Sequence, residues 1–186
     1  MKLVEGLAAI GDVDPPSGTP RHADVDGFVA ALSDIGAATD CAVQPFDARG
    51  IVDAAHLEAA VEHANRAVAR GEAVAEDRAV EILCYAAGRR QIQQAMALGV
   101  AAGVTPVVVV VDDGRLGHPD EPRAVGDEAA AAARVADHLA VEPTLDRTDT
   151  DRVRSFFDVG DAELAAVDDG LSLLVRERVA LLDVEK

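Results

Sequence analysis

The run VTPVVVVV, residues 104 to 111, decides the fold of this chain. It is almost entirely β-branched, and such a continuous apolar run is typical of a central strand that is buried on both faces. It is far too short to cross a lipid bilayer. Further strands are expected over Lys2–Ile10 and Thr39–Phe46, with an edge strand over Val141–Leu145.

Helical patterns occupy most of the remaining chain. The clearest one follows the capping residue Asp53, runs from Ala54 to Arg70 and ends at Gly71. Further helices are predicted over residues 24–35, 76–87, 89–98, 127–140, 149–157, 161–167 and 171–183. Because several helices follow one another directly, we expect one α/β domain over residues 1–186, with a mixed α+β arrangement in which helices cover a mixed sheet.

The charge of the chain is strongly negative. It carries 34 acidic and 17 basic residues, a formal net charge of −17, and only Lys2 and Lys186 are lysines. Half of the residues are hydrophobic, so the acidity does not indicate disorder. A surface loaded with carboxylates is typical of proteins from salt-loving organisms, although an ordinary acidic protein stays open as an alternative.

The two cysteines and the start of the chain predict a location. Cys41 and Cys84 lie in apolar surroundings without metal-binding spacing, as expected for buried, reduced thiols of a cytoplasmic protein. The first residues lack the pattern of a signal peptide, and no association with a membrane is expected.

The segment EILCYAAGRRQI, from Glu81 to Ile92, is the most informative one for function. It predicts a helix end, a break at Gly88, and a second helix that opens on Arg89 and Arg90. Cations are unfavourable at a helix N-terminus, and guanidinium groups beside free N–H groups would form an anion site, most simply for phosphate. Alternatively, both arginines pair with nearby carboxylates.

Local acids do not explain these arginines. Arg66 has Glu62 four residues earlier, in the favoured order for an exposed ion pair on a helix. Arg89 and Arg90 have no acidic residue four positions before or after them. The sequence therefore favours a binding role for this pair.

Catalytic motifs were not found in the sequence. It contains no phosphate loop, dinucleotide fingerprint or nucleophile elbow. His56 and His63 are about 10 Å apart on one helix, too far to share a metal ion. The turn-rich, acidic stretch from Asp112 to Gly126 predicts a surface loop. These features favour a non-enzymatic binding protein that needs no cofactor and no metal.

Three separated blocks of the sequence resemble one known family. These are FDARGIVDAAHLEAAVEHANRA (46–67), EILCYAAGRRQIQQAMALGV (81–100) and LVRERVALLDV (174–184). The chain is identified by them as a member of the family of the KEOPS kinase-associated small subunit, which includes the animal PRPK-binding protein, and as an archaeal, halophilic type. Two departures are Ala87, where the family often has serine, and the long loop of residues 112–126.

The resemblance implies a role in tRNA modification. KEOPS places threonylcarbamoyl on the adenosine beside the anticodon, and the chemistry belongs to another subunit. This subunit would bind the atypical kinase/ATPase of the complex, contact the other KEOPS subunits through it, and grip the single-stranded 3′ CCA end of tRNA. Carried onto this sequence, the expected tRNA-binding residues are Gly88, Arg89, Arg90, Gln91 and Ile92.

Two points of this interpretation have alternatives. The kinase could contact the final helix through Leu174, Val175, Val179 and Leu182, or the exposed side of the helix Ala54–Arg70, but core packing explains most of these residues equally well. The chain could also be a pure protein–protein adaptor that activates the kinase without contacting RNA. A small enzyme that uses Arg89 and Arg90 to bind a phosphorylated substrate is the least favoured alternative.

Overall fold

A single mixed β-sheet forms the centre of the protein. A computed structural model describes residues 1–186 except 116–125, 169, 185 and 186. The order of the sheet is β2-β1-β4-β3, and β5 pairs with β1. Within the described residues, β1 and β2 are parallel and the other pairs are antiparallel. The strands are β1 (Lys2–Ile10), β2 (Arg21–His22), β3 (Ala42–Asp47), β4 (Gly103–Asp112) and β5 (Ala140–Val141).

The valine run is the centre of this sheet, as predicted. β4 lies between β1 and β3, and Val107 to Val111 are fully buried. The odd-numbered valines of this run face one hydrophobic core, and Val108 and Val110 face the other. Alternation of side chains along a strand explains this division, since each residue points to the face opposite its neighbours.

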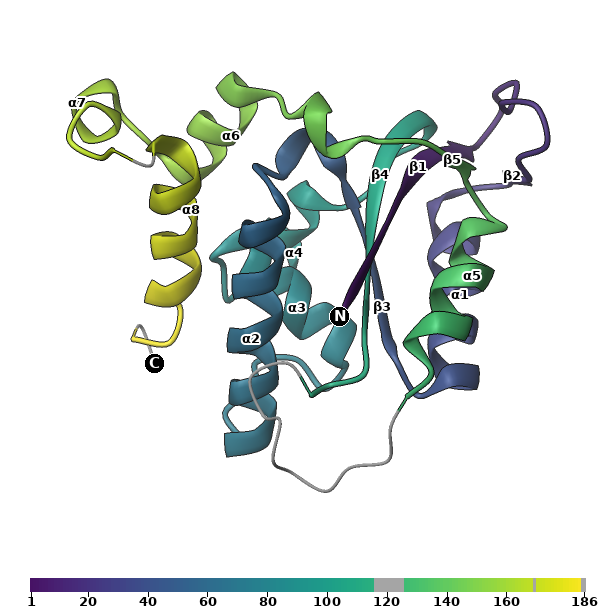
Figure 1. The fold of residues 1–186 in the computed structure, drawn as a ribbon, viewed down its shortest axis with the longest axis horizontal. Coiled ribbons are helices and arrows are strands. Elements are labelled where there is room, and N and C mark those ends of the chain that lie inside the picture. The colour runs from purple at the N-terminus through teal and green to yellow at the C-terminus, as the bar shows by residue number, and fades with distance from the viewer. Residues whose placement is uncertain (116–125, 169, 185–186) are drawn as a thin grey trace.

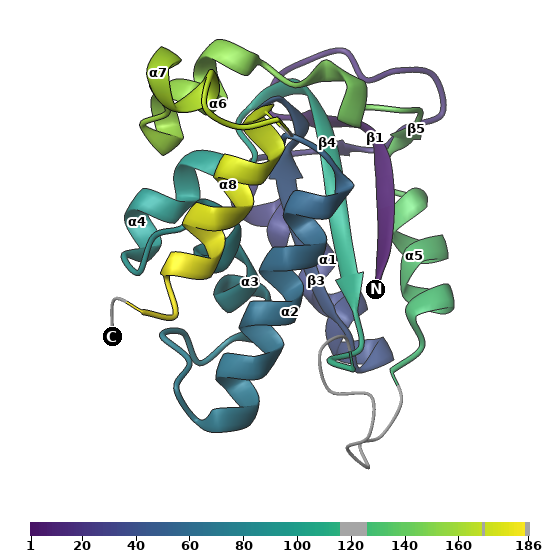
Figure 2. The same ribbon diagram turned by 60° about the vertical axis from the view of Figure 1, so that its left-hand side comes forward.

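Helices cover both faces of the sheet (Figure 1). One face carries α1 (Val25–Thr39) and α5 (Glu128–Ala136), and the other carries α2 (Ala54–Arg70) and α3 (Arg78–Ala87). The last helix, α8 (Gly170–Leu181), packs against α2 on the side away from the strands (Figure 2). The prediction of one α/β domain with a mixed sheet covered by helices is confirmed.

The predicted helix caps are confirmed by the backbone. Asp53 accepts a hydrogen bond from the His56 N–H at 2.8 Å, and Gly71 ends α2 in the left-handed conformation at a φ of 70°. Asp24 accepts in the same way from the Gly27 N–H at 2.7 Å. These local signals fix the helix ends, because a side-chain oxygen satisfies an N–H that has no partner within the helix.

Several predicted elements are shorter in the structure. Thr39 belongs to α1, so β3 begins at Ala42, and the predicted edge strand over Val141–Leu145 is reduced to β5. The remaining elements are η1 (Ala48–Gly50), α4 (Ile92–Ala95), η2 (Met96–Leu98), η3 (Leu145–Arg147), α6 (Thr150–Phe157) and α7 (Asp161–Leu164).

The predicted surface loop at Asp112 is only partly described. Asp112 and Asp113 are buried at the end of β4, so the prediction is wrong for its first two residues. Most of the loop lies outside the described residues. None of the helices in the described part of the chain is both long and apolar enough to cross a bilayer.

Candidate functional site

The connection between α3 and α4 begins with a tight turn at Gly88. The Gly88 N–H donates to the Tyr85 carbonyl at 2.9 Å and the Arg89 N–H donates to the Cys84 carbonyl at 3.0 Å. This Schellman-type ending needs a residue with positive φ, and Gly88 has a φ of 58°. A Cβ atom here would lie 3.2 Å from the Arg178 carbonyl oxygen, so Gly88 also allows α8 to pack closely.

The predicted start of the following helix is wrong. Arg89 is not helical, Arg90 and Gln91 form a bend, and α4 begins only at Ile92. Gln91 has the extended conformation of a capping residue, although its side chain makes no capping hydrogen bond. Because α4 has four residues, it has almost no macrodipole, and the electrostatic argument from a helix N-terminus does not apply.

Arg89 is held by the carbonyl groups and the aromatic ring beside it. Its Nη2 donates to the Phe156 carbonyl on α6 at 2.9 Å, and its Nη1 donates to the Gly88 carbonyl at 3.3 Å. The guanidinium carbon lies 5.4 Å from the centre of the Phe156 ring, a cation–π arrangement. These contacts orient the cation but leave its charge unneutralised.

Arg90 has a less common environment. One of its terminal nitrogens, Nη1, is enclosed and has no hydrogen-bond partner among the described residues. No carboxylate in the described part of the chain forms an ion pair with Arg90. The alternative that both arginines are absorbed by internal ion pairs is therefore contradicted for these residues.

Two exposed apolar side chains follow the arginines. The helical spacing of this segment predicts that Ile92, Ala95 and Met96 all point inward, but the exposed fractions of Ile92 and Met96 are 42% and 60%. The prediction is confirmed for Ala95, which is buried together with Leu98. Gln91 is exposed beside them, and its Oε1 accepts a hydrogen bond from Gln94 at 2.7 Å.

A partly buried polar network involves Tyr85, three residues before Gly88. The Tyr85 hydroxyl donates to Asp183 Oδ1 at 2.5 Å, and His63 Nδ1 lies 2.7 Å from Asp183 Oδ2. Burial and the bond to Asp183 raise the pKa of Tyr85 well above its ordinary value, while Arg90 lowers it slightly. Tyr85 is 2% exposed, so it packs in the core and does not offer a ring for stacking on a base.

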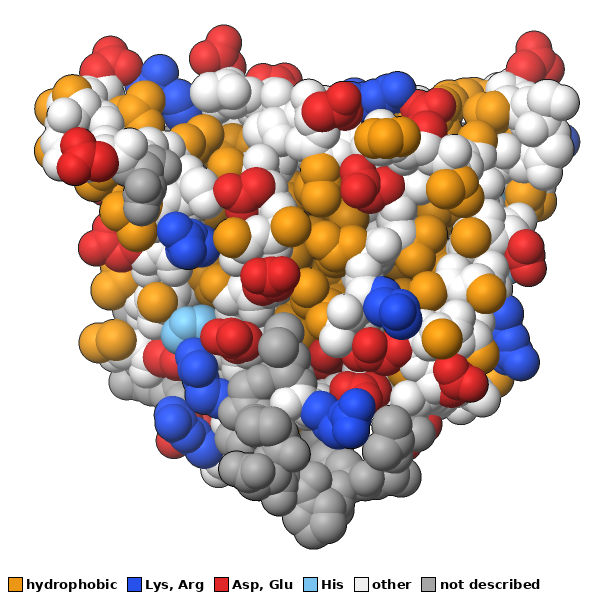
Figure 3. All heavy atoms as spheres, viewed as in Figure 1, with side chains coloured by type: hydrophobic (Ala, Val, Ile, Leu, Met, Phe, Trp, Pro, Cys, Tyr) orange, Lys and Arg blue, Asp and Glu red, His pale blue; other side chains and the backbone are white. Residues whose placement is uncertain are grey.

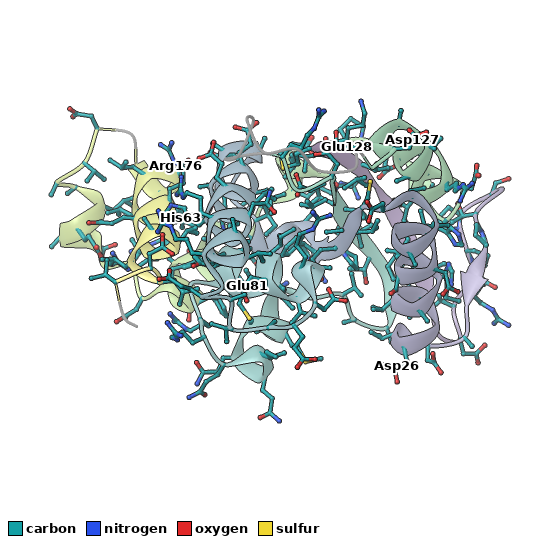
Figure 4. All side chains as sticks on the ribbon, turned by 90° about the horizontal axis from the view of Figure 1, so that it is seen from below. Asp26, His63, Glu81, Asp127, Glu128 and Arg176 are labelled. Carbon is teal, nitrogen blue, oxygen red and sulfur yellow. The ribbon has the colours of Figure 1, made fainter. Side chains whose placement is uncertain are left out.

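His63 lies at the contact between α2 and α8. Figure 4 shows His63 on α2 and Arg176 on α8 on the facing sides of these helices. The Asp183 carboxylate therefore ties the end of α8 to both α2 and α3. Sequence reasoning missed this link, because Tyr85 and Asp183 are 98 residues apart in the chain.

Glu81 is a second residue whose role the sequence did not reveal. It is fully buried on α3, and its Oε2 accepts hydrogen bonds from the Val74 and Ala75 N–H groups at 2.9 and 2.8 Å. It thereby fixes the connection between α2 and α3. The acidic residue at the start of the EILCYAAGRRQI segment is thus explained by the fold.

The predicted kinase-contact residues on α8 are part of the core. Leu174, Val175, Val179 and Leu182 are buried in the cluster that includes the inner face of α2. The apolar residues that α8 and the residues after it expose are Leu173, Leu181 and Val184. A partner of α8 would therefore meet this other side of the helix.

An acidic cluster lies at the opposite end of the sheet. Oxygen atoms of Asp112, Asp113 and Glu128 lie within 4.8 Å of one another. The Met1 ammonium is 2.6 Å from Glu128, and Arg115 is 2.8 Å from Asp113. Figure 4 shows Glu128 beside Asp127 at the start of α5. Because these two cations offset most of the negative charge of the three carboxylates, we assign no metal to the cluster.

A groove of about 500 Å³ follows the free edge of β3. It lies between α1 and the beginning of α3, and its charged lining residues include Asp40, Glu76 and Arg78. None of the residues from Gly88 to Ile92 lines it. The arginine-bearing surface is therefore separate from this groove.

The fold and the site together define an α/β protein with a short arginine-bearing surface beside an exposed apolar pair, an arrangement suited to binding. The chain belongs to the family described as kinase binding protein CGI-121, which it matches over residues 28–183. This match includes both the Gly88–Ile92 segment and α8. A comparison with curated proteins found no match.

Proposed function

We propose that this chain is the kinase-binding small subunit of an archaeal, halophilic-type KEOPS complex, and that it holds both the atypical kinase/ATPase and the 3′ CCA end of tRNA. Membership of a kinase-binding family supports the first half of this proposal. The protein acts in the cytoplasm without a cofactor, and other subunits reach it through the kinase and supply the chemistry of threonylcarbamoyl transfer.

The environment of Arg90 carries the tRNA half of the proposal. In a chain with twice as many acidic as basic residues, a guanidinium without a carboxylate partner needs an explanation. An enclosed donor without a hydrogen bond costs about 1–3 kcal/mol. Arg90 as a whole is half-buried, and although its Nη1 is enclosed, an RNA phosphate at the accessible side of the residue would supply the missing negative charge.

The neighbouring groups match the other parts of a single-stranded RNA end. Arg89 is oriented by Phe156 while its charge stays available to a second phosphate. Ile92 offers an exposed apolar surface for an unstacked base or a ribose, and Gln91 offers amide groups for a base edge. Gly88 contributes indirectly, because its turn places these residues at the surface.

The kinase contact belongs on the outer side of α8. Leu173, Leu181 and Val184 are exposed there, while the inner side of the helix is occupied by α2. An exposed apolar stripe of this kind is a usual means of forming a stable interface. This surface and the Gly88–Ile92 loop are distinct, so one protein could hold both partners at once.

A charge-matched pair of variants tests the tRNA contact. We expect Arg90→Glu to lower the affinity for intact tRNA on the order of a hundredfold, because it replaces a phosphate-binding cation with an anion. The control is Arg21→Glu on β2, which makes the same change in net charge at an exposed position far from the loop (Figure 1). Affinities would be measured by gel shift with tRNA, with and without its CCA end.

Kinase binding is common to the two candidate functions and therefore serves as the control, whereas tRNA binding separates them. Both variants should co-purify with the kinase and retain the circular dichroism spectrum of the wild type. If Arg90→Glu bound tRNA as well as Arg21→Glu did, the RNA contact would be wrong, and the chain would be a pure protein adaptor.

A further inference from the structure

Two hydrogen bonds connect α6 with the two ends of the α4–η2 segment. Arg89, which precedes the segment, donates to the Phe156 carbonyl at 2.9 Å, and Arg152 donates from Nη2 to the Ala97 carbonyl at 2.9 Å. Arg152 and Phe156 are four residues apart, so they share a face of α6. This face of α6 therefore contacts both the residue that precedes the α4–η2 segment, Arg89, and a residue near its end, Ala97.

A second pair of arginines lies at the far end of the segment. Asp47, which is buried, receives two hydrogen bonds from Arg49 at 2.9 and 2.8 Å and one from Arg152 at 2.6 Å. Burial alone would raise the pKa of Asp47, but these two guanidiniums lower it below its ordinary value. One carboxylate therefore orients two cations.

Both cations keep donors that point away from Asp47. The side chains of Arg49 and Arg152 are 44% and 33% exposed, and each has N–H groups that these contacts do not use. Asp149 adds negative charge near Arg49, so the surface there is close to neutral overall. Binding at this end would come from directed guanidinium donors more than from net charge.

The exposed apolar pair lies between the two ends. Ile92 and Met96 are four residues apart on the segment, and Met96 is next to Ala97, whose carbonyl Arg152 binds. Arg89 and Arg90 precede Ile92 in the chain. The order along this surface is thus arginine pair, apolar pair, arginine pair.

We infer that the RNA-binding surface continues past Ile92 across Met96 to Arg49 and Arg152, and that a single RNA strand crosses α4–η2 with its backbone held at both ends. This inference rests on the proposed function and extends the same site. A single strand fits because its unstacked bases can pack on Ile92 and Met96, whereas the bases of a duplex are stacked on one another.

Arg49→Gln is the principal test, with Met96→Ala as a second variant. Arg152 and the Arg49 N–H still bind Asp47 after the first change, so the fold should be kept, and a thermal melt checks this. The matched control is Arg21→Gln, since Arg21 pairs with Asp12 on the far side of the sheet. Affinity for tRNA with and without the CCA end would be measured by fluorescence anisotropy at several salt concentrations.

We expect Arg49→Gln and Met96→Ala each to weaken binding of intact tRNA by roughly three- to tenfold. Neither should change the affinity for tRNA that lacks the CCA end. Loss of one phosphate contact should also reduce the salt slope of Arg49→Gln by about 0.7, as for single strands.

The outcomes separate the inference from the proposed function. If Arg90→Glu abolishes binding while Arg49→Gln and Met96→Ala bind intact tRNA like Arg21→Gln, the longer strand path is wrong and the proposed function stands. If Arg90→Glu has no effect, the proposed function and this inference both fail.

Discussion

His56 shows how a single buried residue can make stability depend on pH. It is fully buried on α2, its ring packs edge-on against Phe157, and its Nε2 donates to the Ala86 carbonyl at 2.8 Å. Burial lowers the pKa of His56 to about 4, although the bond to Ala86 and the charge of Asp53 oppose that effect. The ring therefore stays neutral in the folded protein.

This shift predicts a loss of stability in mild acid. Between pH 6.5 and pH 4 the unfolded chain binds a proton at His56 that the folded chain does not, so the free energy of unfolding falls as the pH is lowered. We expect a loss of roughly 2 kcal/mol from this group between pH 7 and pH 5. Urea unfolding at both pH values would measure it.

His56→Gln is the control for this effect, because its amide can still donate to the Ala86 carbonyl. Carboxylates titrate in both proteins, so only the difference in pH sensitivity reports on the histidine. A variant that lost as much stability as the wild type between pH 7 and pH 5 would contradict the assignment.

At the level of elements, the junction of α3 with α8 depends on Gly88. Its φ of 58° is unfavourable for other residues, and an added methyl group would meet the Arg178 carbonyl at 3.2 Å. We expect Gly88→Ala to destabilise the protein by about 2–3 kcal/mol, because backbone strain and displacement of α8 add together. Chemical denaturation would measure the change.

The chain offers a matched control at the end of α2. Gly71 has a similar φ of 70°, and a Cβ atom there would meet nothing within 4 Å. Gly71→Ala should therefore cost only the backbone strain, about 1 kcal/mol. Equal losses in the two variants would show that close packing of α8 does not depend on Gly88.

The elements also show what the sequence could specify. The valine run predicted β4 because its composition is a local property, and Asp53 and Gly71 predicted both ends of α2 for the same reason. A helix was predicted from Arg89 because Arg and Gln favour helices. The prediction was wrong because the Arg89 N–H donates to the Cys84 carbonyl and so closes the turn that ends α3.

Contacts between distant segments account for what the sequence left open. The apolar spacing of this segment predicted burial of Ile92, Ala95 and Met96, but nothing in that spacing showed that only Ala95 of these three would face the core. The pairing of Asp47 with Arg152 joins residues 105 positions apart, and such a link has no local signal. The position of the arginine pair was evident from the sequence; its environment was not.

At the scale of the whole molecule, the charge of −17 sets the background for every binding event. Acidic side chains are scattered over the face shown in Figure 3, and hydrophobic side chains gather between α2 and α5 near the edge of β1. Under the proposed function an RNA would approach a repulsive surface, and its affinity would have to come from a few directed contacts at α4–η2. Salt screens the repulsion as well as the attraction, so we expect the net salt dependence of tRNA binding to be shallow.

The same charge should make stability depend on salt. Like charges on a compact protein repel one another, and raising the salt concentration from 0.1 to 1 M shortens the Debye length from about 10 to 3 Å. We expect the midpoint of thermal unfolding in KCl to rise by about 5 °C over this range, equivalent to roughly 1–2 kcal/mol. The midpoint should rise little further above 1 M KCl, because screening of the charges is nearly complete at that concentration. A stabilisation caused by exclusion of salt from the protein surface would instead continue to grow above 1 M. A midpoint that stays constant or falls would show that the carboxylates are too well paired or too far apart to repel, and the halophilic interpretation of the composition would then lose its physical basis.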